Sequence, residues 1–101
     1  MEYTADQLKR AVQLGALGYG AEKCANVLEI EDRDAFDADF YNAESEFKRY
    51  YQKGKDMADF SIDAKLFELA KDGDISALHE LNERQAVREL EDEDKFTDKY
   101  T

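Results

Sequence analysis

The sequence predicts an all-α fold, for three reasons. The 101 residues contain no Pro and only five Gly, so few positions would break a helix. Apolar residues recur at spacings of three and four along most of the chain, which is the period of an amphipathic helix. Glycines and helix-capping residues separate these stretches. The length suits one compact domain, which we divide into a three-helix unit (residues 1–43), a long helix with a short C-terminal helix (44–90) and an acidic tail (91–101).

The first helix is expected to begin after Thr4. Its hydroxyl can cap free backbone N–H groups of the first turn, and Gln7, three residues later, can return a hydrogen bond in a capping box. Gly18 and Gly20 predict the end of this helix, because glycine takes positive φ without steric strain. An apolar stripe at helical spacing lies between these limits, formed by Leu8, Ala11, Val12, Leu14, Gly15 and Leu17.

Residues 21–41 read as two short helices separated by a three-residue turn, Glu29 to Glu31. Cys24 and Phe36 can fill the flanks of a small core between the helices, whose other members would be Ala25, Leu28, Ile30 and Ala35. These offsets predict a helix-turn-helix. A plain three-helix core without a nucleic-acid role has the same spacing, so both interpretations stay open.

A long helix is expected over residues 44–72, followed by Gly73 as a stop signal and Asp74 as the cap of a last helix that ends near Leu90. The long helix carries two apolar stripes, whereas a helix that faces water on one side needs only one. Unbroken, it would span about 43 Å, so it either kinks near Gly54 or projects and packs against another copy. We therefore predict an oligomer interface at Met57, Phe60 and Phe67.

The last helix carries apolar residues at Ile75, Leu78, Leu81 and Val87. The tail from Glu91 has few apolar groups to offset the entropy of ordering it, although Phe96 and Tyr100 could dock on a neighbour. One cysteine excludes an internal disulfide and suits a reducing compartment. No apolar run has the length of a membrane span, and the N-terminus lacks a signal-peptide pattern. These features predict a soluble, intracellular protein.

The net charge of −11 is unevenly distributed. Residues 44–71 carry 6 basic and 6 acidic side chains, whereas the segments on either side are acidic. Cations beside Tyr50 and Tyr51 could neutralise phosphates while the rings lie against sugars or bases; these cations are Lys48, Arg49, Lys53 and Lys55. A second group of candidate nucleic-acid contacts is Lys9, Arg10 and Lys23, joined by Arg33 of the third helix. The alternative is a solvated helix face, in which Glu44 and Lys48 form an i,i+4 ion pair.

Signals for catalysis or metal binding are weak. The Gly-Lys pair at 54–55 lacks the upstream Gly and the Ser or Thr of a phosphate-binding loop. His79 is the only histidine, and Cys24 falls on an inward face where burial raises the pKa of a thiol. The acidic run at 32–39 has Asp37 at its sixth position, where a calcium loop needs Gly. We predict no enzyme activity, no cofactor and no metal site.

Read together, these residues resemble the small subunit of phage terminases, the DNA-recognition component of genome packaging. The resemblance rests on the helix-turn-helix at 21–41 and on the pattern that follows: Glu46-Phe47, Gly54-Lys55, Ala58-Asp59, Leu66, Ala70, Gly73-Asp74, Ala77, Leu81 and Arg84. It implies a helical homo-oligomer in the cytoplasm of a bacterial host cell. The resemblance further implies that the helix-turn-helix binds DNA for a large packaging subunit, and that the protein itself is neither nuclease nor motor.

The sequence departs from the family pattern in the third helix, whose common aromatic-plus-basic ending is replaced by Phe40-Tyr41-Asn42, and in two further features. The turn residue that is usually Gly is Glu29, and the third helix has only Arg33 to balance Asp32, Asp34, Asp37 and Asp39. Recognition helices usually present Arg, Lys, Asn or Gln to DNA, and carboxylates would repel the phosphates. The alternative function is therefore an acidic adaptor or DNA-mimic module that keeps the fold and uses this helix to bind a basic protein surface.

Overall fold

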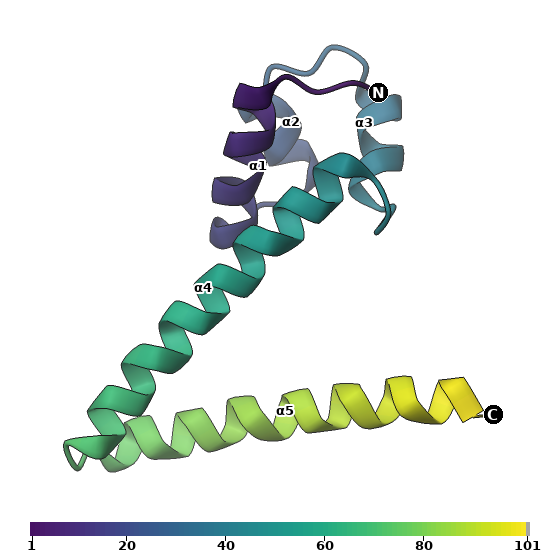
Figure 1. Ribbon diagram of the computed structural model, residues 1–101. Coiled ribbons are helices and arrows are strands. Elements are labelled where there is room, and N and C mark those ends of the chain that lie inside the picture. Colours follow the sequence, from purple (N-terminus) through teal and green to yellow (C-terminus); the bar gives the residue numbers. More distant parts are fainter. Residues whose placement is uncertain (101) are drawn as a thin grey trace. The chain divides into compact units, whose positions relative to one another are not determined.

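The protein is all-helical, as the sequence predicts. The computed structural model describes the backbone of residues 1–100 and the side chains of residues 1–91. Within the described residues the secondary structure consists of five helices, α1 (Ala5–Leu17), α2 (Ala21–Val27), α3 (Arg33–Phe40), α4 (Glu46–Lys71) and α5 (Ile75–Tyr100), labelled in Figure 1. The chain forms two compact units, Met1–Phe60 and Ser61–Thr101.

Side-chain caps fix the helix starts of the first unit. Thr4 and Gln7 form the predicted capping box at α1, with the Gln7 N–H donating to the Thr4 hydroxyl over 3.1 Å. Asp32 caps α3 by accepting a hydrogen bond from the Ala35 N–H. Ser45 accepts one from the Lys48 N–H, and α4 therefore begins at Glu46, two residues later than the sequence suggests.

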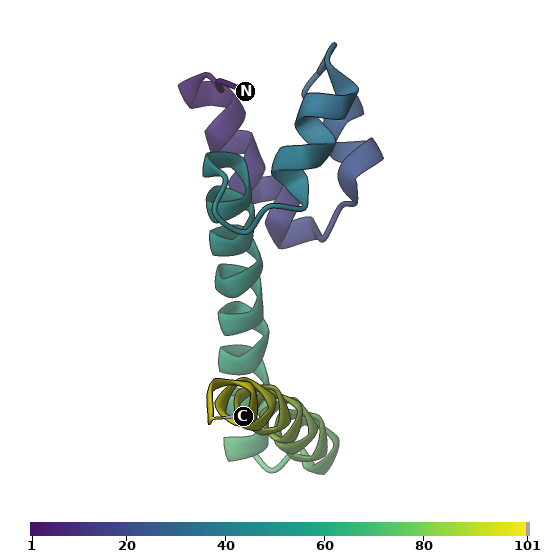
Figure 2. The same cartoon turned by 90° about the vertical axis from the view of Figure 1, so that its right-hand side faces the viewer.

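The core of the first unit is aromatic. Phe36 and Phe47 are fully buried, and their rings meet edge to face with centroids 4.9 Å apart. Cys24 is also fully buried, and the predicted core residues Ala25, Leu28 and Ile30 are buried with it, while Ala35 is half-buried. Figures 1 and 2 show α1, α2 and α3 grouped around the N-terminal end of α4, which carries Phe47 into this core.

The predicted turn at 29–31 lies between the C-cap Leu28 and the N-cap Asp32. The Ile30 N–H donates to the Ala25 carbonyl over 3.0 Å, which closes α2 with the hydrogen bond of a Schellman motif. In this motif the residue after the C-cap takes the left-handed conformation, and Glu29 does so with φ of 55°.

Two glycines let α1 and α4 approach at backbone contact. A Cβ at Gly15 would lie 1.9 Å from the carbonyl oxygen of Tyr51, and one at Gly54 would lie 1.8 Å from that of Val12. The sequence leaves open a kink at Gly54, but α4 is one continuous helix there. The glycine instead removes the side chain that would hold the two helices apart.

The second unit has a small core formed by Leu66 of α4 with Ala77 and Leu81 of α5. Asp74 caps α5 as predicted, accepting a hydrogen bond from the Ala77 N–H over 3.0 Å. Of the apolar residues predicted to line the last helix, only Leu81 is buried, and three are exposed: Ile75, Leu78 and Val87. The α5 helix packs on α4 through one narrow face, formed by Ala77 and Leu81, and the three exposed side chains lie outside it.

The C-terminal helix runs on to Tyr100, ten residues past the end predicted near Leu90. The side chains predicted to form a solvated tail, with Phe96 and Tyr100 among them, lie outside the residues whose side chains are described. No helix in the described part of the chain is both long and apolar enough to cross a bilayer.

A charged cluster joins α4 and α5 beside that small core. The Arg84 Nε donates to Asp63 Oδ1 over 2.7 Å, and Arg88 donates to the other carboxylate oxygen of Asp63. Partial burial of the carboxyl favours a higher pKa, but the two guanidinium groups outweigh it and lower the pKa of Asp63 from its ordinary value. The cluster therefore holds the two helices together through an ionised carboxylate.

Candidate nucleic-acid and oligomer surfaces

Of the four carboxylates in and just before α3, two hydrogen-bond within the fold and two make no hydrogen bond to a described residue. Asp32 is the helix cap, and Asp39 accepts a 2.6 Å hydrogen bond from the Tyr3 hydroxyl and lies 3.9 Å from the N-terminal amine. Burial, and then the hydrogen bond to Asp39, raise the pKa of Tyr3 well above its ordinary value, so the phenol stays a donor. Asp34 and Asp37 are exposed and form no ion pair with any described residue. Two of the four carboxylates expected to repel DNA, Asp32 and Asp39, thus also make structural contacts.

Arg33, the cation of the third helix, is turned toward α2. Its guanidinium donates to the side-chain oxygen of Asn26 over 2.9 Å. The bond joins the two helices on either side of the turn, so this arginine has a structural contact as well as an exposed charge.

Lys48 lies against aromatic rings rather than in open solvent. Its ammonium is 4.1 Å from the ring centroid of Phe40 and 4.5 Å from that of Tyr51. Burial, with the nearby charge of Lys55 as a second cause, lowers the pKa of Lys48. The ion pair with Glu44, which belongs to the alternative of a solvated helix face, does not form among the described residues, because the lysine packs over the core instead.

The four cations predicted on the long helix do not form one patch. At about 100° per residue, Lys48 and Lys55 fall on one face of α4 and Arg49 and Lys53 on another. Arg49 and Lys53 are exposed and line a surface hollow with Tyr50 and Glu46. Of the four predicted cations, Arg49 and Lys53 are therefore the two that line a surface hollow beside an aromatic ring.

The cations of α1 and α2 have neighbours of their own. Arg10 forms an exposed ion pair with Asp6 over 3.2 Å, and the Lys23 ammonium lies 4.2 Å from the ring centroid of Tyr19. Lys9 is exposed and makes no ion pair with a described residue.

The predicted oligomer residues all lie open on α4. The exposed fractions are 54% for Met57, 73% for Phe60 and 54% for Phe67. Together with Ala64 they follow a 3-4-3 spacing, which places them along one side of the helix as the a and d positions of a coiled-coil seam. We call these four residues the α4 seam.

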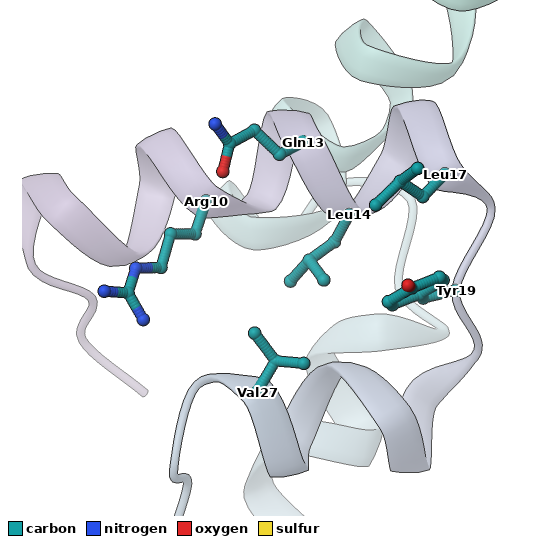
Figure 3. Close-up of a pocket in the computed structure, with 6 residues that line it drawn as sticks. All are labelled: Arg10, Gln13, Leu14, Leu17, Tyr19 and Val27. Atoms are coloured by element: carbon teal, nitrogen blue, oxygen red, sulfur yellow. The ribbon is translucent and has the colours of Figure 1, made fainter.

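A groove between α1 and α2 is a feature that the sequence analysis missed. It has a volume of about 360 Å³ and is lined by Arg10, Gln13, Leu14, Leu17, Tyr19 and Val27. Figure 3 shows Leu14 and Val27 pointing toward each other, with Arg10 and Tyr19 at opposite ends. Leu14 and Leu17, three residues apart on α1, belong to the apolar stripe that the sequence predicts, but Leu14 is buried and Leu17 is exposed. That stripe is the only sequence signal for the groove.

Cys24 and His79 are the remaining side chains that could take part in a chemical reaction. The buried Cys24 Sγ donates to the Tyr19 carbonyl oxygen over 3.4 Å, and burial raises the pKa of its thiol. His79 is exposed on α5. No group of three possible metal ligands occurs among the described residues.

Comparison of the chain with protein-family models, with curated proteins and with solved structures finds no match.

Proposed function

We propose that the protein is a helix-turn-helix DNA-binding component of phage genome packaging, similar to a terminase small subunit and acting as a homo-oligomer. The observation that carries the proposal is the corner between α2 and α3. Ala25 and Ile30 are buried at the crossing, and Glu29 holds a left-handed turn at the position where the resemblance places Gly. A small residue, a left-handed turn and a buried aliphatic residue in this order are what a helix-turn-helix requires.

The charge distribution supports a particular mode of DNA contact. Asp34 and Asp37 leave α3 poorly suited to a groove, whereas Arg49, Tyr50 and Lys53 offer two cations and a ring on one side of α4. With only a few cations per subunit, each copy would bind weakly, and an oligomer would raise the overall affinity by multivalency. The α4 seam supplies an apolar surface for that oligomer.

A second function is favoured by a specific observation. Asp34 and Asp37 are exposed on the face that would be the recognition surface, and they lack ion-pair partners among the described residues. Such a surface suits an acidic adaptor that binds a basic protein.

The test is a gel-shift titration of the oligomer with duplex DNA at low and moderate salt. The DNA-binding proposal expects a shift whose log affinity falls linearly with log salt concentration. In the double variant Arg49→Gln/Lys53→Gln the slope should flatten by roughly 2, since each phosphate neutralised contributes about 0.9. Lys48→Gln/Lys55→Gln is the charge-matched control and should change the slope less, because Lys48 packs over Phe40 and Tyr51. No shift at low salt, together with binding of a lysine-rich helical peptide, would replace this function by the adaptor.

A further inference from the structure

The α1–α2 groove combines an apolar floor with a cation, Arg10, at one end and an aromatic ring, Tyr19, at the other. Leu14 forms the floor, and the exposed side chains of Leu17 and Val27 form its walls. Figure 3 shows Arg10 at one end of the groove and Tyr19 at the other. The Lys23 ammonium lies over the Tyr19 ring, 4.2 Å from its centroid. In a chain of net charge −11, an apolar groove between two cations is a local exception, and it favours an occupant with apolar side chains flanked by carboxylates.

The α5 helix carries a surface of that kind. Val87 and Leu90 are 55% and 62% exposed, one turn apart, and the acidic side chains that share their face at helical spacing are Glu80, Glu83 and Glu91. We call these five residues the α5 ridge. The side of α5 that packs on α4 is a different one, since it is formed by Ala77, Leu81 and Arg84.

We propose that the α1–α2 groove of one copy binds the α5 ridge of a second copy. Val87 and Leu90 enter the apolar centre, and the flanking glutamates face Arg10 and Lys23. This is helix-in-groove recognition, in which apolar residues three to four apart anchor an amphipathic helix. Arg10 can accept a new partner because its exposed ion pair with Asp6 is of the kind that contributes little.

The contact is heterologous, because groove and ridge are different surfaces and each copy has one of each. Heterologous contacts build rings or open chains, whereas α4 seams would associate through the same surface on every copy. The inference rests on the homo-oligomer in the proposed function and names one of its interfaces.

The experiment compares three glutamate substitutions on the full chain by light scattering. Leu17→Glu blocks the groove and Leu90→Glu blocks the ridge, while Leu78→Glu, an exposed leucine on another face of α5, is the matched control. Each blocking variant should lower the average mass and raise the dissociation constant on the order of tenfold or more, whereas the control keeps the mass of the wild type. Circular dichroism establishes that all three remain folded.

Mixing the two blocking variants gives the decisive readout. One still has an intact ridge and the other an intact groove, so a 1:1 mixture should have a higher mass than either variant alone. Arg10→Glu should weaken assembly more than Lys9→Glu, which changes the same charge beside the groove without lining it.

A mixture whose mass equals that of its components, or blocking variants that assemble as the wild type does, would overturn the groove contact. If either result is obtained and the wild type still shifts duplex DNA, the groove contact has failed and the proposed DNA binding stands. A monomeric wild type would remove both this contact and the oligomer on which it rests.

Discussion

Gly54 of α4 lies in direct backbone contact with Val12 of α1. A Cβ on Gly54 would come within 1.8 Å of the Val12 carbonyl oxygen, and the reciprocal contact of Gly15 with Tyr51 is almost as close. The two contacts show that α1 and α4 meet through their backbones. The crossing holds Phe47 and Tyr51 of α4 in the aromatic core, so it sets the position of the helix that also carries Arg49 and Lys53.

Gly54→Ala should therefore destabilise the protein. Alanine would favour the helix by about 1 kcal/mol, but a backbone clash of this kind is not relieved by rotating a side chain, and overpacking costs about 1–3 kcal/mol or more. We expect a net loss and a lower melting temperature in thermal unfolding followed by circular dichroism. Gly20→Ala is the control, because nothing lies within 4 Å of its added Cβ. Equal melting temperatures for the two variants would contradict the close crossing.

Glu29→Gly should stabilise the turn between α2 and α3. Glu29 holds φ of 55°, while Gly18 and Gly73 occupy the same place in the hydrogen-bonded ends of α1 and α4. Glycine relieves the strain of the left-handed conformation, but it also increases the conformational entropy of the unfolded chain. The free energy of unfolding should therefore rise by about 0.5–1 kcal/mol. Chemical denaturation would measure it as a higher midpoint. Glu31→Gly, at a residue without positive φ, should give no gain, and a gain there as large as at Glu29 would show that strain is not the cause.

The hairpin of α4 and α5 should lose stability in acid. Because Arg84 and Arg88 lower the pKa of Asp63 below its ordinary value of 3.8, the carboxylate contributes fully above about pH 5 and progressively less as the pH falls through its lowered pKa. The melting temperature of Asp63→Asn should lie below that of the wild type at pH 7, and the gap should close toward pH 3. Asp72→Asn, at an exposed carboxylate, should show no such closing. A gap that is the same at both pH values would exclude the ionised carboxylate as the cause.

The local features of the fold were predictable because they depend on residues close in sequence. Thr4 with Gln7, and Asp74 after Gly73, define helix ends through hydrogen bonds that span only a few residues. The core around Cys24 was likewise predictable, because the spacing of apolar residues on two short helices leaves few ways to pack the helices together.

The site was less predictable, because it depends on which face of each helix is covered. Lys48 and Arg49 are neighbours in sequence but lie on different faces of α4. The rings of Phe40 and Tyr51 lie beneath the Lys48 ammonium, which sequence spacing does not reveal. The bond from Tyr3 to Asp39 joins residues 36 apart and gives a structural role to a carboxylate that looked repulsive. The α1–α2 groove arises from the packing of two helices and had no motif of its own.

Self-association should depend on the α4 seam. Phe60→Asp/Phe67→Asp would remove two exposed aromatic side chains, each of which stabilises an interface by about 1.5–3 kcal/mol when buried. We expect a clear fall in mass by light scattering at micromolar concentration, with helicity unchanged. Ile62→Asp is the control, since Ile62 is exposed on another face of the same helix. A double variant with the mass of the wild type would remove the seam from the assembly.

The charge of α3 separates the two candidate functions. Asp34→Asn/Asp37→Asn removes two exposed carboxylates and leaves the Asp32 cap and the bond from Tyr3 to Asp39 in place, so the fold should be unaffected. If α3 faces DNA, the loss of repulsion should strengthen duplex binding in gel shifts, most at low salt, where charge repulsion is least screened. Asp72→Asn/Glu89→Gln changes the net charge equally at exposed positions of the second unit and should strengthen it less. If the two carboxylates instead hold a basic partner, the same α3 variant should weaken binding of a lysine-rich peptide and leave DNA binding undetectable.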